Sequence, residues 1–137
     1  MGLEIYLAGP WADRHLMPEI ASKFEAIGCV CTHKWWEIED VDEVERTPAL
    51  LRKQAEMDRD GVEKAKLMIL INSSKSEGKA VEQGIAIANH IPIIAVGKRG
   101  EFSKNVFHYL PLYFWSESIE AVLPVVDFIA NIVNNFE

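Results

Sequence analysis

Basic charge is the first property that this sequence has little of. The 137-residue chain carries 14 lysine and arginine residues against 21 aspartate and glutamate residues, which gives a net charge of -7 at pH 7. Proteins that bind nucleic acids or anionic membranes present a basic face to them. This composition therefore disfavours both kinds of partner and favours a small molecule or another protein.

Cysteine is nearly absent. The two that occur, Cys29 and Cys31, alternate with Val30 and so point to one face of a predicted strand that continues to His33. Two cysteines and a histidine can bind a metal, but no fourth ligand lies at a usual zinc spacing. We therefore expect reduced, buried thiols, and neither a metal nor a cofactor.

Signals for export and for common cofactors are also lacking. The chain does not begin with a basic and then apolar segment, and its longest apolar stretches are interrupted by charge, as at Asp127. We accordingly expect no membrane span and a cytoplasmic location. The glycine fingerprints of dinucleotide-binding and P-loop proteins are missing, as is the serine elbow of hydrolases. The commonest uses of an α/β sheet are thereby removed.

The hydrophobic fraction, in contrast, is ample. At 49% of the chain it supports one domain over residues 1–137 with its own core. The most informative stretch is Leu67 to Asn89, which begins with the continuous apolar run of a strand covered on both faces. A loop follows from Asn72 to Gly78, and then apolar residues recur at helical spacing at Val81, Ile85 and Ala88.

Further strands are predicted at 3–8, 29–33, 92–96 and 112–115, with helices between them. Thr47 and Pro48 are typical of a helix start, and Gly28 of a helix end. Pro124 lies inside the last predicted helix and indicates a kink or a late start there. This alternation predicts an α/β fold: a single-domain, doubly wound, five-stranded parallel sheet of flavodoxin-like order 2-1-3-4-5.

Two carboxylates stand out on the predicted helices. Apolar residues from Leu51 to Ala65 form a stripe on the helix after Pro48, and Asp58 fills the gap in that stripe. Asp60 and Glu63 fall outside it and are expected to be solvated. A buried carboxylate needs partners or a task, because desolvating a charge is unfavourable by several kcal/mol, on the order of the values found for buried ions. Asp58 thus serves either a bond to a neighbouring loop or a site.

The expected crevice lies between the first and third strands, where the topology gathers Tyr6, Gly9, Trp11, the loop 73–78 and Glu82. Two carboxylates, an aromatic hydroxyl and a tryptophan that can stack on a flat ligand suit glycosidic chemistry. Glu82 near a helix start is expected to be an anion, and the pKa of Asp58 to be raised. The acidic stretch Trp35 to Glu45 is either a solvated loop or a lid.

The chain resembles the nucleoside 2-deoxyribosyltransferase family over nearly its whole length. The resemblance rests on Ile5-Tyr6-Leu7-Ala8-Gly9-Pro10-Trp11 followed by Asp13-Arg14, on Asp58 with Gly61, on Gly78 with Glu82 and Gly84, and on Asn105. It implies transfer of a deoxyribosyl group between nucleobases, with Glu82 as the nucleophile that forms a covalent ester. Tyr6 would orient Glu82, and Asp58 would handle the departing and incoming base. The substrate-binding residues it implies are Gly9, Trp11, Ser76, Gly78, Lys79 and Asn105.

Asn105 matches an asparagine that family members lend to the neighbouring subunit's site. The resemblance therefore implies a homo-oligomer, a dimer or a hexamer, with shared active sites. The aromatic residues that follow Asn105 suggest an exposed surface for this contact: Phe107, Tyr109, Tyr113, Phe114 and Trp115.

Two departures from the transferase pattern leave alternatives open. Ser76 stands where many transferases have an aspartate, and Lys79 where threonine is common. The related 2'-deoxynucleoside 5'-monophosphate N-hydrolases use serines around the 5'-phosphate, and Ser74, Lys75, Ser76 and Lys79 can be read as such a site. The Gly9-Pro10-Trp11 turn, however, lacks the hydrolases' serine. We therefore favour the transferase over the hydrolase, with a non-catalytic nucleotide-binding module as the third alternative.

Overall fold

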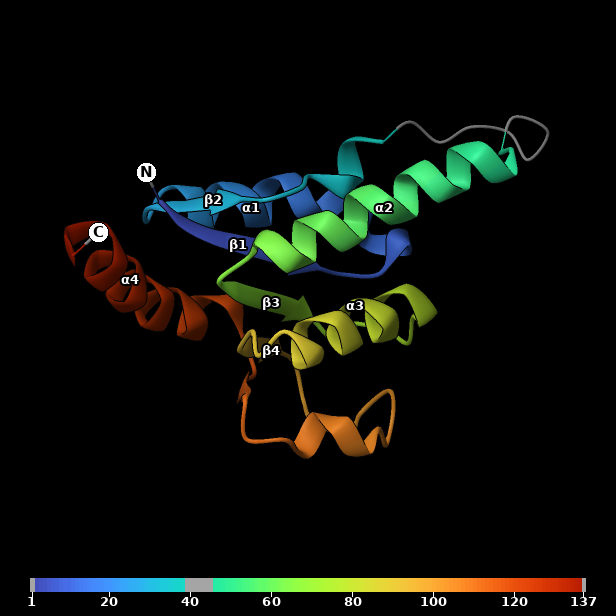
Figure 1. Cartoon of the computed structure of the whole chain (residues 1–137). Helices are drawn as coiled ribbons and strands as arrows, with labels where there is room; N and C mark the ends of the chain where they lie inside the picture. Colours follow the sequence, from blue (N-terminus) through green and yellow to red (C-terminus); the bar gives the residue numbers. More distant parts are fainter. Residues whose placement is uncertain (1, 39–45, 137) are drawn as a thin grey trace.

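A computed structural model of the chain, which describes residues 2–38 and 46–136, contains one five-stranded parallel sheet (Figure 1). The strand order is β2-β1-β3-β4-β5, so the predicted flavodoxin-like topology is confirmed. The strands are β1 (Leu3–Ala8), β2 (Cys29–Cys31), β3 (Leu67–Ile71), β4 (Ile93–Val96) and β5 (Tyr113–Ser116). The second strand is shorter than expected: it ends at Cys31 and not at His33.

Helices cover both faces of the sheet. The α-helices are α1 (Met17–Glu25), α2 (Pro48–Lys64), α3 (Glu77–Ala88) and α4 (Ile119–Phe136), and the 3-10 helices include η1 (Trp11–Leu16), η2 (Trp35–Glu37) and η4 (Val106–Tyr109). Helices α1 and α4 contact each other on one face, and α2 and α3 contact each other on the other. Figure 1 shows α2, α3 and the segment around η4 running in succession across one side of the molecule.

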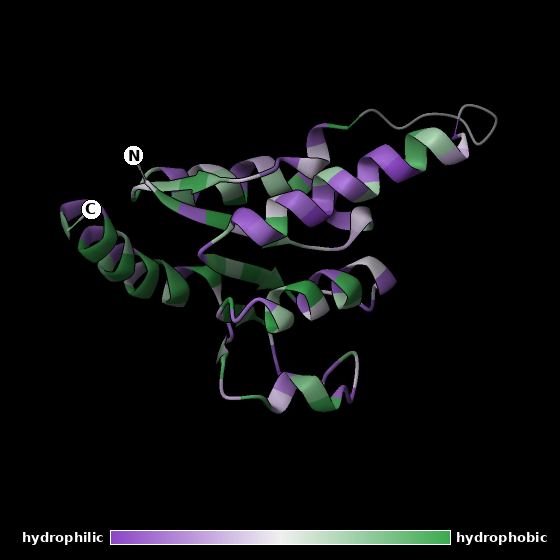
Figure 2. Ribbon diagram, in the orientation of Figure 1, coloured by the Kyte–Doolittle hydropathy of each residue, from purple (hydrophilic) through white to green (hydrophobic). Residues whose placement is uncertain are grey.

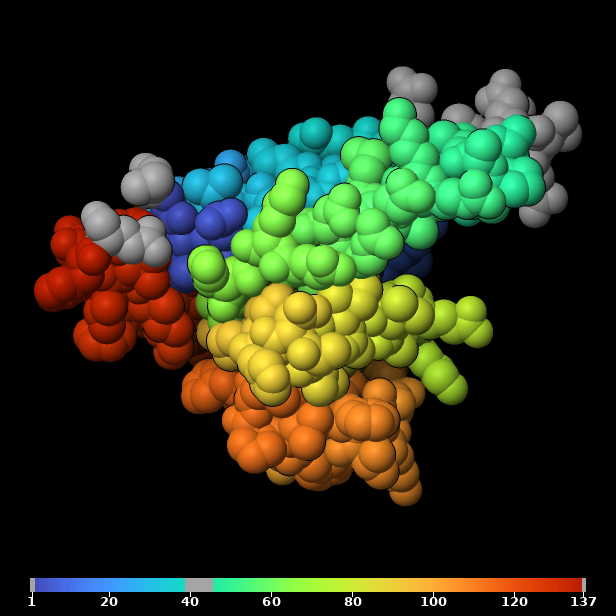
Figure 3. All heavy atoms as spheres, in the orientation of Figure 1, coloured from blue at the N-terminus to red at the C-terminus, as the bar shows by residue number. Residues whose placement is uncertain are grey.

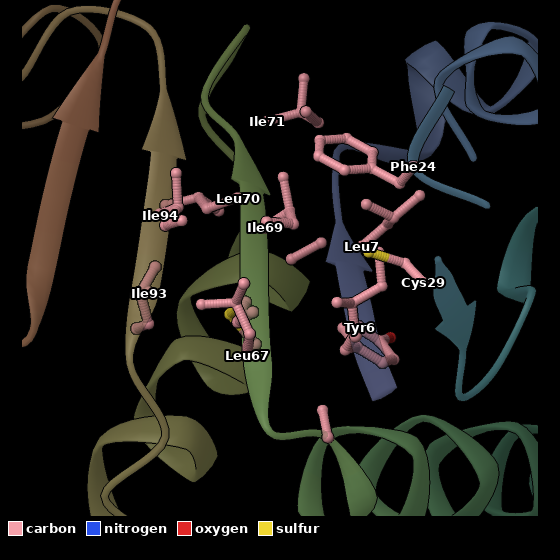
Figure 4. Close-up of a cluster of buried hydrophobic side chains, with 14 of the residues drawn as sticks. Tyr6, Leu7, Phe24, Cys29, Leu67, Ile69, Leu70, Ile71, Ile93 and Ile94 are labelled. Atoms are coloured by element: carbon pink, nitrogen blue, oxygen red, sulfur yellow. The ribbon is translucent and has the colours of Figure 1, made fainter. Parts of the chain in front are cut away.

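The core lies around β3, whose five residues are all buried. Its neighbour β1 is buried at every position except Glu4. Figure 4 shows Tyr6 and Leu7 of β1 beside Leu67 and Ile69 of β3, with Phe24 of α1 next to Leu7 and Ile71. A continuous apolar run is what a parallel strand needs when helices cover both of its faces.

The predicted helix signals are present. The Thr47 side chain accepts a hydrogen bond from the Leu50 amide at 3.2 Å, and Pro48 begins α2. Gly28, with a φ of 98°, lies in the turn between α1 and β2. Pro124 lies in the second turn of α4, and the helix continues through it to Phe136.

The predicted apolar stripe on α2 is wrong in its first half. Leu51 is 41% exposed and Ala55 is also exposed, whereas the buried residues of this helix are Gly61 and Val62. The reason is visible in Figure 1, where the amino half of α2 runs out beyond the edge of the sheet. In Figure 2 the outer end of this half is hydrophobic and hydrophilic residues follow it, so its apolar residues lie where there is no sheet to cover them. Asp60 and Glu63 are exposed beside Arg59, as expected.

The predicted inward face of α3 is wrong at Val81 and Ala88, whereas Ile85 packs against the core as expected. Val81 is 64% exposed and Ala88 is exposed, whereas Lys79, Gln83 and Ala86 point inward. Lys79 and Gln83 can be buried because they donate hydrogen bonds to main-chain carbonyls. Hydropathy alone therefore missed the two buried polar positions of this helix.

The expectation that no segment is apolar enough to cross a membrane fails for α4. Its 18 residues reach a mean hydropathy of 1.3, which satisfies the length and composition of a span. In the structure, α4 packs against β1, β4 and β5 through Val122, Val126 and Ala130.

Trp35 and Trp36 are buried in η2. Residues 39–45 of the acidic stretch lie outside the described residues.

Candidate functional site

The centre of the site is a contact between β1 and α3. The Tyr6 ring is fully buried, and its hydroxyl donates a hydrogen bond to Oε2 of Glu82, 76 residues further along the chain. Parallel pairing of β1 with β3 brings Tyr6 opposite Met68, so the helix that follows β3 returns over the tyrosine. Burial and the nearby carboxylates raise the pKa of Tyr6, so its hydroxyl remains a hydrogen-bond donor.

Glu82 is partly buried in the second turn of α3. Burial raises its pKa to about 7, against the opposing effect of the hydrogen bond from Tyr6. The expectation of a stable anion near a helix start is therefore wrong. The helix dipole acts mainly within the first turn, so it does not offset the loss of solvent at this position.

Asp58 of α2 is the second carboxylate. Its charge raises the pKa of both Tyr6 and Glu82, which places it in the same electrostatic environment. The pKa of Asp58 is itself raised, as expected, because the carboxyl is desolvated, and His33 opposes this shift. The polar group nearest to the Asp58 carboxyl is the His33 side chain, whose Nε2 lies 3.2 Å from Oδ1 of Asp58.

Gly61 explains how α2 comes so close to β1. A Cβ atom at this position would lie 2.7 Å from Cβ of His33 and 3.1 Å from the Tyr6 ring. The carbonyl of Gly61 also accepts a hydrogen bond of 2.6 Å from the Thr32 hydroxyl. Because Asp58 precedes Gly61 by three residues on the helix, this close approach turns Asp58 toward the sheet.

An aromatic surface lies next to the end of β1. Trp11 is 43% exposed, and its ring centroid is 6.2 Å from that of Trp35, whose indole N–H donates to the Leu7 carbonyl. The Arg14 guanidinium lies 4.5 Å from the centroid of the Trp11 ring. Gly9 allows the chain to turn closely over Met17, since a Cβ there would lie 2.6 Å from the methionine methyl carbon.

The loop before α3 is held from within. Lys79 is 3% exposed and donates hydrogen bonds to the carbonyls of Ile71 and Ser74. Its ammonium group therefore stabilises the loop from within. This differs from the expectation that Lys79 binds a phosphate. Ser76 caps α3 by accepting from the Lys79 amide at 3.3 Å. Gly78 is exposed, and nothing around it requires a glycine.

Asn105 lies on the other side of α3 from Tyr6. It begins η4, accepts a hydrogen bond from the Phe107 amide, and lines a cavity of about 150 Å³ with Ser76 and Gln83. Figure 3 shows this part of the chain next to α3, away from α2. The structure thus does not bring Asn105 to the Tyr6–Glu82 contact within one chain.

Two polar features near α3 and β2 were not predicted. Gln83 accepts a hydrogen bond from the Tyr113 hydroxyl at 2.7 Å and lies 3.0 Å from Nε2 of His108, which is buried. His33 faces Asp58, and the thiols of Cys29 and Cys31 are free, with pKa values raised by burial to about 12 and 11. Over residues 2–38 and 46–136, no three potential metal ligands cluster.

The raised pKa of Glu82 predicts a pH dependence of stability. Its folded-state pKa of about 7 exceeds the ordinary value of 4.5, so the folded state binds this proton more tightly than the unfolded state. The free energy of unfolding should therefore fall as pH rises through this interval. Glu82→Gln lacks the effect, so its stability relative to wild type should increase between about pH 5 and about pH 8 in urea denaturation.

Glu77→Gln is the matched control for this measurement, since Glu77 is exposed in the first turn of the same helix. Its stability relative to wild type should stay constant over the same interval. Parallel curves for the Glu82 variant and wild type would contradict a raised pKa.

Comparison with known proteins bears on the fold. No family model matches the chain, and no curated protein matches it in sequence. The crystal structure of a conserved protein from Enterococcus faecalis V583 superposes with a TM-score of 0.66 at 19% identity, covering 94% of this chain and 99% of that one. The solution structure of BlsM superposes with a TM-score of 0.57 at 18% identity, covering 96% and 91%. The chain shares its five-stranded α/β architecture with both proteins.

Proposed function

We propose that this protein cleaves the N-glycosidic bond of 2'-deoxynucleosides and transfers the deoxyribosyl group to another nucleobase. The observation that carries this proposal is the hydrogen bond from the buried Tyr6 to Glu82. Asp58 is close enough for its charge to raise the pKa of Glu82. A carboxylate held by a neutral donor, a second carboxyl group and an adjacent aromatic surface are the parts that such a reaction requires.

In the first half-reaction, a Glu82 oxygen attacks C1' of the sugar. The C1'–N bond breaks, its electron pair passes to the base nitrogen, and Asp58 gives its proton to the base. In the second half-reaction, a nitrogen of the incoming base attacks C1', Glu82 departs as a carboxylate, and Asp58 takes up the proton that the incoming base loses. Tyr6 donates to Oε2 of Glu82, which leaves Oε1 for the attack.

Burial raises the pKa of both carboxyl groups, so their roles are assigned from their contacts. With a pKa of about 7, part of the Glu82 population is anionic at neutral pH, and that form accepts the hydrogen bond from Tyr6. Asp58 has a raised pKa, which favours the protonated form that a departing base needs.

The alternative is hydrolysis of a deoxynucleoside 5'-monophosphate, in which water resolves the same ester. Ser76 at the start of α3 supports this reading, because helix amino termini bind phosphates. Lys79 does not support it, because its ammonium is engaged by two carbonyls. A non-catalytic nucleotide-binding module would have no need for the Tyr6–Glu82 contact. The balance of these observations favours the nucleoside and the transferase.

Substrate choice provides the test. We expect a higher kcat/KM for thymidine than for its 5'-monophosphate, and product formation that depends on a second free base. Ser76→Asp should leave thymidine turnover equal or improved. If the loop instead binds phosphate, Ser76→Asp should weaken use of the monophosphate by about 1 to 3 kcal/mol, the value of a charged hydrogen bond. A clear preference of the wild type for the monophosphate would reject the transferase in favour of the hydrolase.

The proposal includes a homo-oligomer in which Asn105 completes a neighbour's site. The residues that follow Asn105 support it, because Val106, Phe107 and Tyr109 are 75%, 55% and 58% exposed. Phe114 is also exposed, whereas Tyr113 and Trp115 are only partly exposed, which makes the surface smaller than the sequence suggested. We expect light scattering to give a mass above that of one chain, and Phe107→Asp to reduce both that mass and activity. A fully active monomer would contradict the shared site.

A further inference from the structure

His33 and Asp58 lie next to each other, and the proposed reaction gives a role to Asp58 but none to His33. The His33 side chain is 13% exposed and the Asp58 side chain 36% exposed. Nε2 of His33 and Oδ1 of Asp58 are buried and 3.2 Å apart, and within the described part of the chain neither atom has a hydrogen-bond partner, so this close contact is the polar contact that the two atoms share. Each of these two atoms therefore has the other as its polar partner.

The surroundings fix the geometry of this pair. Cβ of His33 faces Gly61 so closely that a side chain at Gly61 would collide with it. The preceding residue, Thr32, is bonded to the Gly61 carbonyl at 2.6 Å. The segment after β2 and the carboxyl half of α2 are thus joined at two adjacent positions, one turn of helix from Asp58.

The pair has its charged and titratable neighbours on defined sides. The charge of Asp58 acts on Tyr6 of β1 and on Glu82 of α3. Lys34, which follows His33, forms an ion pair of 3.4 Å with Glu25 of α1. His33, which follows β2, is the neighbour that lowers the pKa of Asp58.

We propose that His33 is a positioning residue for Asp58: its Nε2–H holds Oδ1, so that Oδ2 is directed to the nucleobase and the carboxylate left after proton donation is stabilised. This inference rests on the proposed function of Asp58 as the group that protonates the departing base. The proton on Oδ2 passes to the base as the C1'–N bond breaks, and the hydrogen bond from His33 to Oδ1 strengthens as negative charge appears there. The incoming base returns the proton to Oδ2, so His33 keeps its own proton throughout.

A double-mutant cycle with two substrates tests the role. His33→Asn should lower kcat for thymidine by about 10- to 100-fold, part of the 10²- to 10⁴-fold that general acid catalysis contributes. It should have little effect on 4-nitrophenyl 2-deoxyriboside, whose leaving group needs no proton. In the Asp58→Asn background, the same change should produce no further loss. His90→Asn is the control, since His90 is exposed and has a φ of 57°, which asparagine tolerates.

Equal losses on both substrates, or in both backgrounds, would overturn the positioning role and leave His33 as a packing residue. A second readout does not depend on turnover: ¹³C NMR titration of the Asp58 carboxyl should show a higher pKa in His33→Asn than in wild type, because His33 lowers that pKa. An unchanged titration would overturn the pair even in an active enzyme. If His33→Asn shifts the Asp58 titration but the wild-type protein turns over neither substrate, the proposed function is rejected, and with it the catalytic part of this inference.

Discussion

Glu82→Gln should lower deoxyribosyl transfer by about 10⁴-fold or more, because glutamine has nearly the same shape but cannot form the covalent ester. The variant should fold, since Tyr6 can still donate a hydrogen bond to the amide oxygen and the side chain is only partly buried. Base exchange between thymidine and adenine, followed by chromatography, measures the effect directly.

The covalent step can be checked separately. Acid-quenched wild-type protein should carry a deoxyribosyl adduct on the peptide that contains Glu82, and mass spectrometry of a peptic digest should show its absence in Glu82→Gln. Glu77→Gln, an exposed change five residues earlier on the same helix, should retain both the activity and the adduct. Activity retained in the Glu82 variant would reject the covalent scheme as a whole.

Asp58→Asn should slow transfer by about 10²- to 10⁴-fold for substrates with a poor leaving group, which is the usual contribution of general acid catalysis. Asparagine cannot release a proton to the base, so the loss should grow as the leaving group becomes more basic. For 4-nitrophenyl 2-deoxyriboside the loss should be small. The slope of log kcat against leaving-group pKa, measured for both proteins, reports this difference.

Asp60→Asn is the matched control, because Asp60 lies on the same helix, is exposed, and pairs with Arg59 at the surface. It should have the wild-type slope and rate. If Asp58→Asn shifts all leaving groups by the same factor, Asp58 supports substrate binding or the fold, and another group must protonate the base.

The sequence predicts the sheet well because its strands are defined by local signals. β1 and β3 begin and end at the residues expected from their apolar sequences, and alternation with helices predicts a doubly wound parallel sheet, for which the flavodoxin-like order chosen is confirmed. The topology also places Tyr6, Asp58 and Glu82 together, because it brings the strand that carries Tyr6 against the one before α3.

The parts that sequence did not predict depend on polar contacts between distant segments. Lys79 and Gln83 are buried on α3 because carbonyls receive their hydrogen bonds, which no hydropathy pattern records. The alternation of Cys29, Cys31 and His33 in the sequence predicts that His33 lies on the same face as the two thiols. It faces Asp58 instead, because β2 ends at Cys31 and Gly61 lets α2 approach.

Tyr6 has its ring among the core residues and its hydroxyl on Glu82. The two ends of one side chain therefore meet two different surroundings, a close-packed interior and the groups around Glu82. Substitutions in the neighbouring core residues of β1 and β3 should move the hydroxyl as well as the ring, since a close-packed interior transmits small changes in volume. A stabilising change next to Tyr6 is consequently also a change in how Glu82 is held.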